Sequence, residues 1–206
     1  MINSVRNRLT GLRQSYAPHE HRPLDGYVVT MSAFTALAGS LAGAVKLTGR
    51  PVPERPATAD VVLISIATHK LSRILAKDSV TSPLRAPFTR YTEPGGSAEV
   101  HEEVRDNGSS VRHSIGELLS CPFCLAVWVA TGLTGGLVLA PRLTRLAATT
   151  LTAVAASDFL QMAYTIAKET AEGERGSKAQ TSDDKAQTSD DDERAGLNGH
   201  AAVTAG

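Results

Sequence analysis

Four apolar segments constrain what this chain can fold into. They cover residues 26–47, 60–76, 121–140 and 146–167. A transmembrane helix needs about 20 mainly apolar residues, and each segment comes close to that length. The sequence therefore predicts an all-α fold, a small polytopic membrane protein with about four transmembrane helices. The alternative for the first segment is a buried helix of a soluble bundle.

Polar regions flank this transmembrane helical domain, which is expected at residues 25–168. Residues 1–24 form a polar, basic arm, and a secretory signal fits it poorly because apolar residues dominate only after Asp25. Residues 169–206 are acidic, have few large apolar side chains and carry one seven-residue sequence twice, at 178–184 and 185–191. Such a segment cannot bury enough surface to offset its ordering entropy, so we expect a disordered tail.

Small residues recur within two of the segments. They let membrane helices approach closely, so these faces are expected to pack against neighbouring helices. The positions are Ala36, Gly39, Ser40, Gly43 and Ala44 in the first segment, and Gly132, Gly135 and Gly136 in the third.

Ionisable residues inside two segments are candidate functional residues, because charge in a membrane span usually faces the protein interior or water. His69, Arg73 and Lys77 lie on one helical face, and Lys70 lies among them. Arg73 and Lys77 suit the headgroup end of the helix. Asp158 lies in the fourth segment at a depth similar to that of Lys70. We therefore hypothesise that Asp158 pairs with Lys70 or His69. The alternative is a protonated or end-facing Asp158.

The connection between the second and third segments is expected to be a loop. Pro83 and Pro87 interrupt any regular helix, and residues 93–112 read as a polar, mobile stretch. This loop and the N-terminal arm hold more Lys and Arg than the other two connectors. The positive-inside rule then predicts a multi-pass protein of the cell inner (cytoplasmic) membrane, with both termini and the loop in the cytoplasm.

The only two cysteines form a Cys-x-x-Cys motif, Cys121 and Cys124, at the start of the third segment. Ser114 and Glu117 have the spacing of a capping box, Ser120 or Cys121 could cap a second helix, and Pro122 suits its first turn.

Three interpretations of the cysteine pair stay open. The pair packs as two small apolar residues. It supplies two ligands of a zinc site, with His113 or His69 as further candidates and His101 also near in sequence. Or it is a thiol–disulfide redox couple. Zinc is the one cofactor that the sequence suggests.

Several function classes are disfavoured. No Lys/Arg-rich run interleaved with aromatic residues suggests nucleic-acid binding. No nucleophile–base pair, phosphate loop or Rossmann fingerprint stands out, so an enzyme is the less favoured class. We expect a non-enzymatic accessory or assembly protein whose partners are the lipid bilayer and other membrane proteins, or a second copy of itself.

Several short motifs within residues 60–168 resemble an uncharacterised bacterial membrane family, domain of unknown function 1360. They are Thr68-His-Lys-Leu-Ser-Arg73, Lys77-Asp78, Pro83-Leu-Arg-Ala-Pro-Phe88 and Glu117-Leu-Leu-Ser-Cys-Pro-Phe-Cys124. The resemblance implies an integral membrane protein with no established activity. It singles out Lys70, Ser72, Arg73, Asp78, Arg85, Cys121 and Cys124 as candidate functional residues.

Overall fold

The computed structural model describes residue 16, residues 22–105 and residues 109–203, and from residue 174 onward it gives the helix alone. The chain divides into two compact units, Met1–Ala155 and Ala156–Gly206. Most of the predicted arm at residues 1–24 lies outside the described residues. In chain order the elements are α2 (Leu24–Thr48), α3 (Thr58–Lys77), the 3-10 turn η1 (Ser79–Thr81), α4 (Ser82–Arg85), β1 (Thr89–Gly96), β2 (Glu99–Val104), α5 (Ser110–Ser120), α6 (Pro122–Leu139) and α7 (Pro141–Val203).

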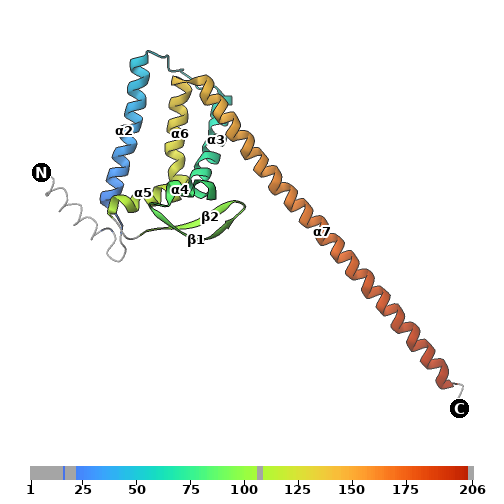
Figure 1. The fold of residues 1–206 in the computed structure, drawn as a ribbon. Coiled ribbons are helices and arrows are strands. Elements are labelled where there is room, and N and C mark those ends of the chain that lie inside the picture. Colours follow the sequence, from blue (N-terminus) through green and yellow to red (C-terminus); the bar gives the residue numbers. More distant parts are fainter. Residues whose placement is uncertain (1–15, 17–21, 106–108, 204–206) are drawn as a thin grey trace. The chain divides into compact units, whose positions relative to one another are not determined.

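In the first unit, α6 packs against both α2 and α3 (Figure 1). Helix α5 contacts α2, α3, α6 and β2, and α4 contacts α3 and α5. Figure 1 shows α4 and α5 at the lower ends of the three long helices, with the β1–β2 hairpin beneath them. The small elements therefore form a layer across one end of the helices.

The apolar core of this unit lies between α3, α6 and the first turns of α7. Ile64, Ala67 and Ala148 are its buried centre. Leucines 63, 133, 137 and 151 pack around them. At the edge of this core, Arg145 donates to both carboxylate oxygens of Asp60, at 2.8 and 2.7 Å.

Helices α2 and α6 approach through an aromatic pair and a glycine. The Phe34 and Trp128 rings meet edge to face, with centroids 5.3 Å apart. A Cβ at Gly135 would lie 3.0 Å from two side-chain carbons of Leu41, which confirms close packing at that glycine. By contrast, a Cβ at Gly39 or Gly43 would meet nothing within 4 Å in the described chain. The packing of the small-residue face of α2, which contains Gly39 and Gly43, against a neighbouring helix therefore stays a prediction.

The four apolar segments are all helical, as predicted, but they differ in membrane character. Among the described helices, α2 and α6 are long and apolar enough to cross a membrane by length and composition. Membrane crossing by α3 and by the fourth segment is not confirmed and remains a proposal.

The all-α prediction holds for most of the described chain, which is mainly helical, but residues 93–104 are not the expected loop. The mobility expected for residues 93–112 stays a prediction. Within the described chain, β1 and β2 form an antiparallel hairpin, and α5 begins at Ser110. The turn uses Gly96 at φ 104° and Ala98 at φ 65°. Polar strands of this kind depend on tertiary contacts, which are described below, more than on apolar alternation.

The second unit, Ala156–Gly206, is the remainder of α7, which continues as helix to Val203. Its large apolar residues up to Ile166 are exposed, among them Phe159, Leu160 and Tyr164. The predicted disordered tail at residues 169–206 falls in this unit. Its disorder in solution stays a prediction.

Candidate functional site

Arg85 is the centre of the layer at the end of the helices. It is the last residue of α4, a four-residue helix that Pro83 helps to begin, and it is 0% exposed. A fully buried guanidinium is rare and requires partners for its charge and its N–H groups. We call the group formed by Arg85 and its hydrogen-bond partners the Arg85 centre.

Part of the Arg85 centre caps the carboxyl end of α3. The Nη1 group of Arg85 donates to the carbonyl oxygen of Leu75 at 2.8 Å, and Nη2 donates to that of Asp78 at 2.9 Å. The Thr81 hydroxyl donates to the carbonyl oxygen of Ile74. The last carbonyls of a helix have no partner within it and carry partial negative charge, so a cation here satisfies both needs.

The other part of the Arg85 centre joins α4 to the hairpin. Arg85 Nε and Nη2 donate to the two carboxylate oxygens of Glu102 at 2.8 and 3.1 Å, and the Thr89 hydroxyl donates to the same carboxylate at 2.9 Å. Arg85 also donates to the hydroxyl oxygens of Thr81 and Ser82. All five guanidinium N–H groups thus have acceptors, and none is left for a ligand. The geometry gives Arg85 a positioning role.

The pKa of the Glu102 carboxyl reflects this setting. Burial acts to raise the pKa of Glu102, but hydrogen bonds from Arg85 and Thr89 and the charge of Arg85 outweigh it, so the pKa is lowered. Glu102 is therefore ionised in the folded protein at neutral pH.

This shift predicts acid sensitivity. The unfolded chain binds the Glu102 proton at a higher pH than the folded chain does, so folding stability rises with pH through that window. Glu102 should stabilise the fold fully above its unfolded pKa and lose that contribution as the pH falls through its folded pKa. We expect the thermal unfolding midpoint of the detergent-solubilised protein to decrease as the pH is lowered from 6 to 3. The decrease should be smaller in Glu102→Gln. If the unfolding midpoints of wild type and Glu102→Gln depend equally on pH, this assignment is contradicted.

A second ion pair ties the hairpin to α3. Arg73 donates to Glu99 through Nε at 3.0 Å and through Nη2, and the two side chains are 43% and 26% exposed. Next to it, the Ser79 N–H donates to the carbonyl oxygen of Ala98 at 3.0 Å, and the backbones of Asp78 and Glu99 form an isolated antiparallel β-bridge. The hairpin is thus held both to α3 and to the start of η1.

The cysteine pair lies at the junction of α5 and α6. Cys121 is the residue between the two helices, and the Cys124 N–H donates to its sulfur at 3.3 Å. Cys121 therefore caps α6, and Pro122 occupies its first turn, as predicted. Both thiols are free, and Cys124 is exposed.

The predicted capping box at Ser114 and Glu117 was wrong. Ser114 lies inside α5, is 2% exposed and donates to the carbonyl oxygen of Ser110 at 2.9 Å. Helix α5 instead starts after Ser109, whose hydroxyl accepts from the Arg112 N–H at 3.4 Å. The short side chain at position 114 is needed for packing, because Ser114 faces Gly26 of α2.

Glu117 brings other polar groups near the cysteines. Its Oε1 lies 3.6 Å from His113 Nε2 and 4.0 Å from Arg22 Nη1, and its charge is close enough to act on the Cys124 thiol. Even so, no three His, Cys, Asp or Glu residues in the described ranges form a group that could hold a metal ion. His69 lies on α3 as an exposed residue. Zinc binding by the cysteine pair, and redox cycling, stay predictions that no contact here favours.

The remaining predicted residues are placed as follows. Ser72 is 2% exposed and donates to the carbonyl oxygen of His69 at 3.0 Å. Lys70 lies half-buried on α3. Asp158 belongs to the second unit, so its proposed pairing with Lys70 or His69 stays a prediction.

Sequence reasoning missed the acidic partners of the two arginines. Glu99 and Glu102 lie three residues apart on β2, and Thr89 starts β1. One feature of the sequence could have indicated them. Arg85 is the single arginine of the apolar Pro83–Phe88 motif, and an arginine buried there needs a carboxylate partner. Glu102 was only one of several nearby acidic residues.

Comparison with known proteins gives a family resemblance but no function. Residues 63–164 match the family described as protein of unknown function (DUF1360). The sporulation protein YjcA of Bacillus subtilis (strain 168) is 40% identical over 73 residues, which are 34% of this chain and 60% of that protein. The chain thus spans less than two thirds of the length of this relative. No solved structure matches.

Proposed function

Because residues 63–164 of this chain match the DUF1360 family, we propose that it is an integral membrane protein with a non-enzymatic accessory or assembly role. One observation carries the membrane assignment. None of the apolar stretch of α2 and only 6% of that of α6 is buried inside the protein. The core helix of a soluble protein would be largely covered, so lipid is the environment that suits these surfaces.

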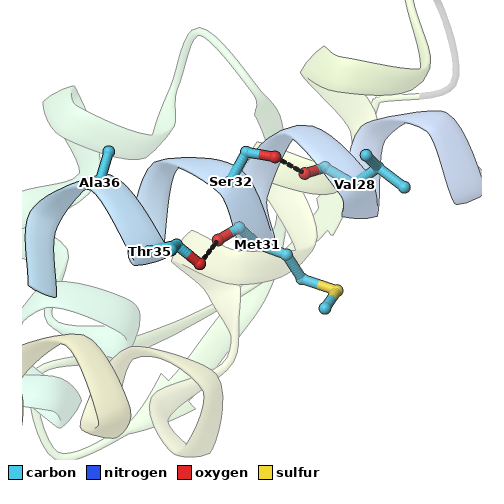
Figure 2. A pocket seen from close by; sticks show the side chains of 5 residues that line it. All are labelled: Val28, Met31, Ser32, Thr35 and Ala36. Atoms are coloured by element: carbon cyan, nitrogen blue, oxygen red, sulfur yellow. Dashed lines mark hydrogen bonds between the residues drawn. The ribbon is translucent and has the colours of Figure 1, made fainter. Parts of the chain in front are cut away.

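The outer surface of α2 supports this proposal. Figure 2 shows a shallow apolar hollow where the Ser32 hydroxyl donates to the carbonyl oxygen of Val28 at 2.7 Å and the Thr35 hydroxyl donates to that of Met31 at 2.9 Å. The hydroxyls are thus satisfied within the helix, and the surface presents no polar group that lipid would leave unpaired.

We extend the proposal to four spans. Val61 and Val62 at the start of α3, and Leu143 and Leu146 at the start of α7, are exposed apolar residues of the same kind. The apolar residues of α7 between Ala156 and Ile166 are exposed as well. The excess of basic residues in the arm and in the α3–α6 connection supports an orientation with both termini and the Arg85 centre in the cytoplasm.

The proposed role follows from how the site is built. The polar groups of the Arg85 centre are satisfied by the chain itself, so their effect is to fix the hairpin layer at one face of the membrane. A fixed surface of this kind suits contact with other membrane proteins. The relative's name refers to sporulation; because that match covers a third of this chain, sporulation is not part of the proposal.

Fractionation and thiol labelling test the membrane assignment and its orientation. We expect the full chain to remain in the membrane pellet after alkaline carbonate extraction. In Cys121→Ser, the exposed Cys124 should react with a membrane-impermeant maleimide only after spheroplasts are permeabilised. In Val52→Cys/Cys121→Ser/Cys124→Ser, the cysteine lies in the α2–α3 connector, where Val52 is 64% exposed. It should react in intact spheroplasts. Recovery in the supernatant would exclude membrane integration, and the opposite labelling pattern would exclude the orientation.

A further inference from the structure

The outer face of η1 and α4 is apolar. Val80 and Leu84 are 85% and 59% exposed, and Pro83 and Pro87 are exposed as well. Val80, Pro83 and Leu84 have the spacing i, i+3 and i+4, which puts them on one side of the continuous helical turns that run from Ser79 to Ala86, and Pro87 follows these turns. We call this surface the α4 face.

Three polar side chains of the same turns point inward, while Ser79 at their start is exposed. Arg85 is completely buried, and the Thr81 and Ser82 hydroxyls both accept hydrogen bonds from its guanidinium. A surface helix of a soluble protein has the opposite arrangement, with apolar residues inside and polar residues in water. This arrangement is the one that an apolar environment outside the α4 face would favour.

Position and charge identify that environment. Helix α4 follows the carboxyl end of α3 after the short turn η1 and lies at the ends of the long helices (Figure 1). Lys77 and Asp78 precede the α4 face, no acidic residue lies between Ser79 and Thr92, and the exposed Arg90 follows the face. Apolar side chains flanked by Lys and Arg are the pattern of a segment that lies in the headgroup region of an anionic membrane.

We propose that the α4 face inserts into the cytoplasmic headgroup–acyl boundary of the bilayer, with the Arg85 centre holding it there. This inference rests on the proposed membrane function, and it names the lipid surface that the extramembrane layer binds. The Arg85 centre would then have two linked effects, since it caps α3 and presents Val80 and Leu84 to lipid.

Site-directed fluorescence in vesicles tests this proposal. In a Cys121→Ser/Cys124→Ser background, single cysteines replace Leu84, Tyr91 or Met31 and carry an environment-sensitive dye. The proteins are reconstituted into phosphatidylethanolamine–phosphatidylglycerol vesicles with lipids that bear a quencher near the headgroup. Tyr91 on β1 is the matched control, because it is 57% exposed, close to the 59% of Leu84. Met31 on α2 is 69% exposed and reports membrane integration alone.

We expect the dye at position 84 to show blue-shifted emission and severalfold stronger quenching than the dye at position 91. If position 84 is quenched no more than position 91 while position 31 is quenched, the inference fails and the membrane assignment stands. If position 31 is not quenched either, the proposed function fails. A blue shift at position 84 without quenching would mean that protein covers the α4 face, and that result also overturns the proposal.

Discussion

Arg85→Ala is expected to destabilise the first unit by about 3–5 kcal/mol, the usual cost of removing one partner of a buried ion pair. The Glu102 carboxylate, 7% exposed, would remain buried without its cation, and the carbonyl oxygens of Leu75 and Asp78 would lose their donors. Arg85→Lys should recover little of this, since an ammonium has three donors in place of the planar fork that serves Glu102 and α3 together. The measurement is the unfolding midpoint of detergent-solubilised protein, followed by circular dichroism.

Two further variants make this prediction specific. Arg73→Ala removes the partly exposed pair with Glu99 and should cost no more than about 1 kcal/mol. Arg85→Met combined with Glu102→Leu removes both buried charges and should be less destabilised than Arg85→Ala. If Arg73→Ala and Arg85→Ala shift the midpoint equally, the Arg85 centre is not what holds the hairpin layer.

Local sequence chemistry predicted much of the fold. The first three apolar segments form helices whose ends fall within a few residues of the expected bounds, because apolar length and helix formation are properties of the segment itself. The fourth segment, expected at residues 146–167, lies inside the much longer α7. The cap at Cys121 and the first-turn Pro122 were predictable for the same reason, since both act within one helical turn.

Contacts between distant residues were not predictable in this way. Arg85 and Glu102 are 17 residues apart, and nothing local marks Glu102 among its acidic neighbours. The hairpin is stabilised by such contacts, so its polar strands resembled a loop. Ser114 had the spacing of a cap, yet the approach of α2 determines its role. In each case the local sequence does not show which element packs against the residue.

The contact between α2 and α5 leads to the second large prediction. At Gly26, an added Cβ would lie 2.1 Å from the Ser114 hydroxyl oxygen and 2.2 Å from the backbone carbonyl oxygen of Ser110. No rotamer change can move a backbone carbonyl, so Gly26→Ala must separate the two helices. Forcing extra atoms into a packed contact costs typically about 1–3 kcal/mol, and this contact is close enough that we expect at least the upper value.

Helix α2 supplies its own control for this substitution. A Cβ at Gly39 meets nothing within 4 Å in the described chain, so Gly39→Ala should stabilise the helix by about 0.5–1 kcal/mol through propensity alone. The same change in the same helix should therefore have opposite signs at positions 26 and 39. Adding Ser114→Ala to Gly26→Ala should restore little, because the Ser110 carbonyl remains. Restoration to the wild-type midpoint would show that the Ser114 side chain alone makes the contact. A Gly26→Ala protein as stable as wild type would mean that α2 and α5 do not approach this closely.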